Sequence, residues 1–310
     1  DAWPPPSHWP DPGVGPQGVP LAALKLAPRR DWDAGFWNEW TPGEAGANAA
    51  LEVFLDGALR GYGEQRDRPD RVGTSRLSPH LHFGEIAPWR VVAALEAQRG
   101  TANGADIDAM RRELGWREFA HHLLHHFPDS VDRNFNPRFN DFDWAQVSER
   151  TLQAWQSGCT GVPIVDAGLR ELWATGWMHN RVRMVVASYL TKHLRLHWRH
   201  GARWFWDTLV DADLANNTLG WQWVAGTGAD AAPYFRVFNP VTQAEKFDPD
   251  GRYIARWVPE LAGLPVPLRL APWRDPALLR RIAPDYPPQP LVDLAAGRDA
   301  ALAAYRQLRG

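Results

Sequence analysis

The sequence predicts an all-α protein. Apolar residues recur at the three- and four-residue spacing of a helix face in several segments, and none shows the sustained two-residue alternation of a strand. Hydrophobic residues make up 45% of the 310-residue chain, which is enough to fill a sizeable core. We therefore expect helices packed on helices.

The elements are predicted in chain order as follows. Residues 1–43 are rich in proline and glycine, and we interpret them as an interdomain linker that precedes a helical domain over 44–310. The first helix is expected over 44–62, where Leu51, Leu55 and Leu59 share one face. Further helical patterns cover 86–95, 107–127, 162–174, 178–196, 204–209 and 294–308. Long loops are expected at 135–148, 225–250 and 259–290, and such loops usually serve a site.

Composition narrows the class of protein. The chain has no run of about 18 uncharged apolar residues, so neither a membrane span nor a membrane partner is expected. The single cysteine, Cys159, cannot form an internal disulfide and lacks the spacing of a zinc site, so we expect no metal and a cytoplasmic location. The net charge of −2 requires any nucleic-acid surface to be a local basic patch. A monomer is the default expectation.

Tryptophan is strongly over-represented, with 18 residues, and many stand beside charged or amide residues. Such side chains fill cores, but they also stack on bases and flavins and can relay electrons. Composition alone leaves both interpretations open.

Three segments carry the strongest chemical signals. The first, 73–85, places hydroxyl residues and Arg76 at the start of a helix. Free backbone N–H groups, hydroxyls and a guanidinium there form a phosphate cradle, although ordinary helix capping also explains the hydroxyls.

The second segment, 209–223, combines two acids, two amides and two tryptophans with apolar neighbours. Burying so many polar groups without a partner is costly, so a polar ligand between them is expected. Asp211 and Asp213 could bind a divalent metal, but the surrounding amides and aromatics favour a planar organic cofactor.

The third segment, 177–184, begins an apolar helix whose Asn and Arg side chains suit phosphates and bases, or simply solvent. A histidine cluster at 121, 122, 125 and 126 has metal-like spacing, but no HExxH glutamate accompanies it. We interpret these histidines as partly buried and structural.

In this order, the three segments resemble the flavin domain of the photolyase and cryptochrome family, over about 62–305. The resemblance implies a helical domain that holds FAD in a bent form. Family photolyases also carry an N-terminal α/β antenna domain, which nothing in this chain matches, so we expect that domain to be absent and its chromophore stays unknown.

The resemblance also implies roles for individual residues. The predicted FAD contacts are Tyr62, Thr74, Ser75, Arg76, Leu77, Ser78, Arg117, Arg183, Asp211, Asp213 and Asn217. The predicted contacts to DNA and its lesion are Arg66, Glu113, Trp116, Asn180, Arg181, Met184, Trp223, Arg236 and Gln243. An electron relay is predicted through Trp221, Trp198 and Trp144, with Glu113 and Asn217 counted among the catalytic residues.

The function implied is light-dependent repair of cyclobutane pyrimidine dimers in DNA, by electron transfer from excited, reduced anionic FAD to a flipped-out dimer. The amide of Asn217 resembles the photolyase choice, whereas plant cryptochromes carry Asp there, and Asn180 stands where a (6-4) enzyme would present His. Glu113 would stabilise the dimer's extra charge, either protonated or through a neighbour. The alternatives are a cryptochrome-type photoreceptor without repair activity and a helical nucleic-acid-binding module without flavin.

Overall fold

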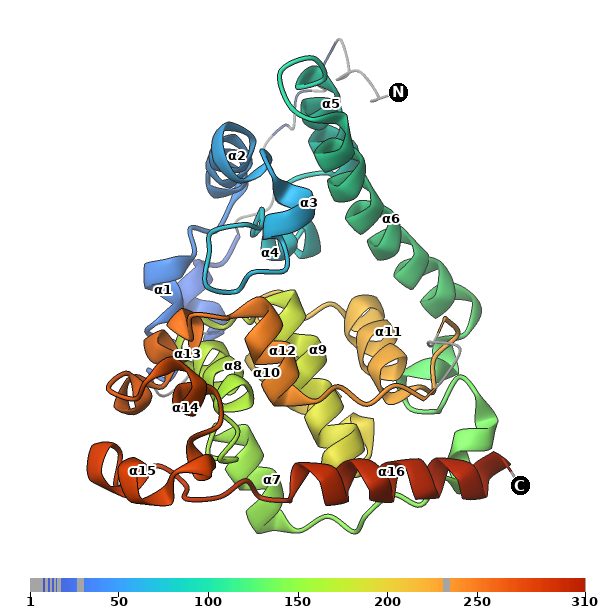
Figure 1. Ribbon diagram of the computed structural model, residues 1–310. Helices are drawn as coiled ribbons and strands as arrows, with labels where there is room; N and C mark the ends of the chain where they lie inside the picture. The colour runs from blue at the N-terminus through green and yellow to red at the C-terminus, as the bar shows by residue number, and fades with distance from the viewer. Residues whose placement is uncertain are drawn as a thin grey trace.

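The computed structural model describes residues 8, 11, 13, 15, 18–26, 31–230 and 235–309. Every regular element within these ranges is a helix, and pairing of the strand type is limited there to one isolated bridge between Arg99 and Ala102. The predicted all-α class is therefore confirmed. Figure 1 shows α6 as a long diagonal helix along one side of the molecule, with α11 beside it and α16 beneath.

The first group of helices precedes and includes α6. Its elements are η1 (Leu21–Leu24), α1 (Phe36–Glu39), α2 (Glu44–Val53), the π-helical turn η2 (Phe54–Ala58), α3 (Tyr62–Gln65), α4 (Ser78–His82), α5 (Pro88–Ala97) and α6 (Gly104–His126). The predicted single helix over 44–62 is wrong in its last part. Gly61, with φ 80°, turns the chain between η2 and α3, a conformation that glycine adopts without strain. Buried Leu51, Phe54 and Ile107 belong to the core of this group.

The predicted linker over 1–43 is described only in part, because residues 1–7, 9, 10, 12, 14, 16, 17 and 27–30 lie outside the described ranges. Its C-terminal end is attached to the helical core, since the indole Nε1 of Trp40 donates a 2.8 Å hydrogen bond to the carbonyl oxygen of Thr175.

The central group surrounds the largest core. It comprises η3 (Pro128–Val131), η4 (Pro137–Asp141), α7 (Glu149–Gln156), α8 (Pro163–Thr175), α9 (Asn180–Ser188), the π-helical turn η5 (Tyr189–His193), α10 (Trp198–Thr208) and α11 (Leu214–Ala225). Helix α11 packs against α6, α9 and α10, and buried Trp155, Trp198 and Trp221 lie in this core. Since α11 is enclosed by three helices, its position determines which side chains face the space between them.

The C-terminal group corrects two of the predicted loops. It contains α12 (Pro240–Phe247), α13 (Arg252–Trp257), η6 (Pro259–Leu261), α14 (Val266–Leu270), η7 (Pro272–Arg274), α15 (Pro276–Ile282) and α16 (Leu294–Arg309). Five prolines of the predicted loops at 225–250 and 259–290 occupy the first turn of short helices, where a missing N–H costs nothing: Pro240, Pro259, Pro267, Pro272 and Pro276. None of the helices in the described part of the chain has the length and apolarity needed to cross a membrane.

Candidate functional site

Two adjoining cavities open between α3, α6, α9 and α11. The larger has a volume of about 600 Å³ and the smaller about 280 Å³. They share the wall residues Arg66, Glu113, Arg117, Asn180, Arg183, Asp211, Asp213 and Asn216. The three segments selected from the sequence therefore meet around one continuous space.

The larger cavity has aromatic and amide walls. Its lining includes Trp116 from α6, Asn180 and Met184 from α9, and Trp221 and Trp223 from α11. Trp116 is 48% exposed and therefore lies at the mouth of the cavity, whereas Trp221 is buried. An entrance with exposed aromatic faces can accept a flat apolar group by stacking.

Asn217 presents an unpaired acceptor within this space. Its Nδ2 donates a 2.9 Å hydrogen bond to the carbonyl oxygen of Ala202, which sets the orientation of the amide. Its Oδ1 is buried without a partner, as is the indole Nε1 of Trp221. Both residues line the larger cavity. Because buried polar atoms are nearly always hydrogen-bonded, these two atoms beside the cavity are candidates for contact with a polar ligand.

The smaller cavity is lined by the predicted phosphate-binding residues Tyr62, Thr74, Ser75, Arg76, Leu77 and Ser78. No side chain caps the N-terminus of α4, so ordinary capping does not account for the hydroxyls there. Arg76 has φ 52°, an uncommon conformation for a residue other than glycine. Its guanidinium lies 4.7 Å from the ring centroids of both Trp40 and Trp177, and its buried Nε lacks a partner.

Two ion pairs balance charge in the shared wall. Nη2 of Arg183 lies 3.0 and 2.8 Å from the two carboxylate oxygens of Asp211, whose side chain is 4% exposed. Nη1 of Arg66 pairs with Oε1 of Glu113. A carboxylate as buried as that of Asp211 requires such a partner, since desolvating an isolated charge is very costly.

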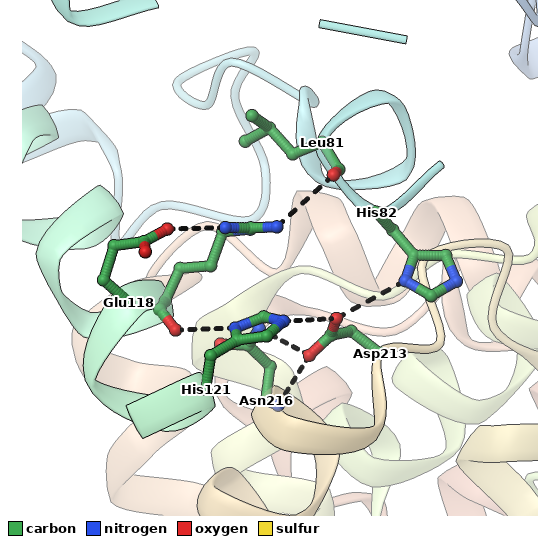
Figure 2. A network of polar contacts seen from close by, with 7 residues as sticks. Leu81, His82, Glu118, His121, Asp213 and Asn216 are labelled. Carbon is green, nitrogen blue, oxygen red and sulfur yellow. Dashed lines mark hydrogen bonds and ion pairs between the residues drawn. The ribbon is translucent and has the colours of Figure 1, made fainter. Parts of the chain in front are cut away.

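Asp213 is the centre of a polar network (Figure 2). Its Oδ1 accepts hydrogen bonds from the backbone N (2.8 Å) and Nδ2 (2.7 Å) of Asn216. Its Oδ2 lies 3.4 Å from Nδ1 of His82 and 3.3 Å from Nε2 of His121. Burial alone would raise the pKa of this carboxyl, but the hydrogen bonds and the adjacent histidines lower it. The arrangement keeps a carboxylate at the cavity wall.

Sequence reasoning did not assign His82, His121 or Asn216 to the site. A signal was present for His121, because it follows Glu113 and Arg117 at successive four-residue steps along one face of α6. The prediction that the neighbouring histidines are partly buried is wrong, since His122, His125 and His126 are exposed. In the described part of the chain, no group of three or more His, Cys, Asp or Glu side chains is suited to hold a metal.

Four predicted residues lie outside both cavities. Arg236 is exposed, with its guanidinium 4.8 Å from the ring of Phe238, and Gln243 lies on α12. Trp198 is buried in the core, where its Nε1 donates a 2.8 Å hydrogen bond to Oδ1 of Asn134. Trp144 is half-buried in the loop before α7. The cavities therefore gather every other predicted residue, including Arg181 and Arg117.

Known proteins share this arrangement of helices. Residues 110–307 match a family model described as the FAD binding domain of DNA photolyase. The chain belongs to the DNA photolyase family. The predicted fold, the helical FAD-binding domain of this family, is thereby confirmed, and the domain accounts for the cavities between α6, α9 and α11.

Photolyases and cryptochromes are both among its relatives. The chain is 49% identical to a deoxyribodipyrimidine photo-lyase of Agrobacterium fabrum, over 98% of this chain and 64% of the relative. It is 42% identical to cryptochrome-1 of Arabidopsis thaliana, over 76% of this chain and 36% of the relative. A bacterial class III photolyase from Agrobacterium tumefaciens superposes with a TM-score of 0.91 at 49% identity, covering 96% of this chain and 63% of that structure. The chain thus spans less than two thirds of the length of these photolyases.

Proposed function

We propose that this chain binds FAD and uses blue light to repair cyclobutane pyrimidine dimers in DNA. The observation that carries the proposal is the larger cavity, which joins the exposed Trp116 at its mouth to the half-buried Asn217 and the buried Trp221 deeper in its wall. The names and identities of the photolyase relatives support the same activity.

The residues present fit FAD. Thr74, Ser75 and Ser78 offer hydroxyl donors in the smaller cavity, as a diphosphate requires, whereas the guanidinium of Arg76 is paired with Glu39. The unpaired Oδ1 of Asn217 suits a ring N–H, which a flavin carries at N5 when it is reduced. Asp213 and Arg183, on the shared wall, would hold the groups between these ends. When bound in its anionic reduced form, FAD supplies a light-driven electron to the dimer and takes it back after the ring opens.

The mouth of the cavity would hold the dimer. Trp116 and Trp223 both line it and provide flat faces for a pyrimidine dimer extruded from the duplex. Extrusion costs least for a lesion that stacks and pairs poorly, which favours damaged DNA before any chemistry. Asn180 and Met184 would complete this pocket from α9.

Glu113 would act together with Arg66. The Glu113 side chain is 31% exposed and paired with the Arg66 guanidinium, so the pair offers a charged N–H donor beside the dimer carbonyls. Of the two roles expected for Glu113, the geometry favours action through a neighbour. Glu113 would position Arg66, which stabilises the negative charge that develops on the dimer.

DNA phosphates would be bound around this mouth. The guanidinium of Arg181 lies 4.4 Å from the ring of Phe247, and its Nη2 lies 2.8 Å from Oδ1 of Asp67, which fix it at the cavity edge. Arg236, exposed and outside the cavities, and Gln243 on α12 remain candidates for outer phosphate contacts.

The test is a spectrum followed by a repair assay. Purified chain should show flavin absorbance and, once reduced, should remove dimers from irradiated oligonucleotide only in light. Glu113→Ala should keep the flavin absorbance but lower the repair quantum yield several-fold, because Arg66 loses its positioning partner. Glu52→Ala, at an exposed site on α2, serves as the control. An unchanged yield in Glu113→Ala would remove that residue from the chemistry.

A cryptochrome-type photoreceptor is the second candidate, favoured by the 42% identity to cryptochrome-1. Both candidates would bind flavin, so absorbance does not separate them. Bound flavin without light-dependent dimer loss would support the photoreceptor. A colourless protein would support neither, and would leave only nucleic-acid binding.

A further inference from the structure

An imidazole contacts two tryptophans of the predicted electron relay. The ring of His197 has its centroid 4.9 Å from that of Trp144 and 5.5 Å from that of Trp198. The interplanar angles are 57° and 32°, so His197 contacts both indoles without stacking squarely on either. The relay predicted from the sequence contains no such residue.

The loop that carries Trp144 is fastened to the segment that carries His197. The backbone N of Ala145 donates a 2.8 Å hydrogen bond to the carbonyl oxygen of Arg195. Nη1 of Arg195 in turn lies 2.7 Å from Oδ2 of Asp143. The Trp144 ring also contacts Phe142, with centroids 4.6 Å apart. Backbone and side-chain contacts therefore hold Trp144 against His197.

The inner end of the relay is also held by close packing. Trp198 and Gly201 lie three residues apart on α10 and so share one face of that helix. Trp221 packs directly on Gly201, since a Cβ built there would lie 2.0 Å from its Cη2 atom. One face of α10 thus carries Trp198 and contacts Trp221. His197 is the N-cap residue of the same helix, directly before Trp198.

His197 is kept neutral mainly by its burial at the start of α10. Its Nδ1 accepts a 3.2 Å hydrogen bond from the backbone N of Arg199, so the proton of the neutral ring is on Nε2. Burial, with the positive charges of Arg199 and His200 nearby, lowers the pKa of His197 to about 4. The ring therefore neither takes a proton from an indole at neutral pH nor adds a positive charge beside one.

We propose that His197 is a positioning residue for the relay, holding Trp144 and Trp198 in contact through a neutral ring. This inference rests on the proposed function. During photoreduction of bound oxidised flavin, Trp221 would give up one electron to the flavin, and the resulting electron vacancy would pass through Trp198 to Trp144. No bond breaks at His197, and an external thiol reductant returns the electron to Trp144.

Two physical effects make the ring useful. Electron tunnelling falls off more slowly through atoms in contact than across a gap, and removing the His197 ring would remove the contacts that it makes with both indoles. A positive charge at His197 would oppose the vacancy, which is itself positive, on both neighbours. The ring of His197 contacts both indoles and carries no charge, and its Nδ1 accepts a hydrogen bond from the first turn of α10, which fixes the orientation of the ring.

A pair of variants separates the ring from the helix cap. His197→Asn keeps a good capping acceptor but removes the ring, whereas His197→Phe keeps a ring and removes the acceptor. We expect His197→Asn to slow photoreduction of oxidised flavin by about tenfold, through loss of positioning, and His197→Phe to stay near the wild-type rate. The measurement is flavin bleaching in blue light with excess thiol, with melting temperatures recorded in parallel. A slow His197→Phe beside a normal His197→Asn would overturn the proposal.

Failure of this proposal is distinguishable from failure of the proposed function. Trp198→Phe is the reference, because it removes the relay itself. Chemically reduced His197→Asn should repair dimers as the wild type does, since repair does not use the relay. If Trp198→Phe slows photoreduction and His197→Asn does not, His197 alone is wrongly assigned. If the wild type binds no flavin, or Trp198→Phe has no effect, the relay and this role of His197 fall together.

Discussion

The contact between Gly201 and Trp221 gives a prediction whose sign can be worked out from the structure. Gly201 lies within α10, where alanine would ordinarily be the better helix former by about 1 kcal/mol. However, a Cβ at this position would lie 2.0, 2.4 and 2.6 Å from three ring atoms of Trp221. The two effects oppose one another, and the distances decide between them.

The steric cost exceeds the gain. Carbon atoms pack at about 3.5 to 4.0 Å, so α10 and the Trp221 ring would have to separate by about 1.5 Å. Overpacking of this kind typically costs about 1 to 3 kcal/mol. Trp221 is buried with its ring against Trp155 and Phe205, so a displaced ring disturbs the core or the cavity that it lines. Because the contacts are as short as 2.0 Å, the cost should lie at the upper end of this range, about 3 kcal/mol. After subtracting the helix gain of about 1 kcal/mol, Gly201→Ala should destabilise the protein by about 2 kcal/mol, a fall in melting temperature of about 3 to 6 °C.

Thermal unfolding followed by circular dichroism tests this prediction. Gly115→Ala is the matched control, because Gly115 also lies within a helix, α6, but a Cβ there meets nothing within 4 Å. The control should raise the melting temperature slightly. Because Trp221 lines the larger cavity, Gly201→Ala should also retain less flavin. A Gly201→Ala variant as stable as Gly115→Ala would refute the reasoning.

Two further predictions concern buried charges. Arg183→Met leaves the carboxylate of Asp211 buried without its ion-pair partner, so the free energy of unfolding in urea should fall by about 3 kcal/mol. Adding Asp211→Asn should restore most of this stability. A single variant as stable as the wild type would contradict the prediction. Burial raises the pKa of Glu171 to about 7 from its ordinary 4.5. The unfolded chain therefore loses this proton first, and stability falls by about 3 kcal/mol as pH rises from about 4.5 to 7. Glu171→Gln has no carboxyl to titrate at this position, so between pH 5 and pH 8 its free energy of unfolding should fall less than that of the wild type in paired urea titrations. Equal pH dependence of the two proteins would count against a buried, protonated Glu171.

The predicted and observed folds agree where a helix has one apolar face. α5 and α16 were recognised because apolar residues repeat along a single side, and that pattern depends only on the spacing within the segment. α11 was missed as a helix. It packs against α6, α9 and α10, and its buried residues include the polar Thr218 and Gln222, so no apolar face stands out in the sequence. The short helices α12, α14 and α15 were missed because their initial prolines were interpreted as loops.

In the candidate site, too, residues within one segment could be predicted from the sequence, whereas contacts between distant segments could not. Motifs such as 74–78 and 211–223 were identified from residue types within single segments, and the structure brings them to adjoining cavities. The contacts of Asp213 with His82 and His121 join three segments far apart in the chain, which local spacing does not reveal. The same is true of His197, whose contact with Trp144 depends on how a loop returns to α10.

The amino-acid sequence by itself determined the helical class, the order of the cofactor and lesion motifs, and the family that they resemble, because each of these is recorded within short stretches of chain. Only the tertiary structure decided which side chains meet: the Arg66–Glu113 pair, the enclosure of α11, the unpaired Oδ1 of Asn217 and the imidazole in contact with two indoles. These contacts depend on the packing of distant helices, and packing is set by the whole core rather than by any one segment.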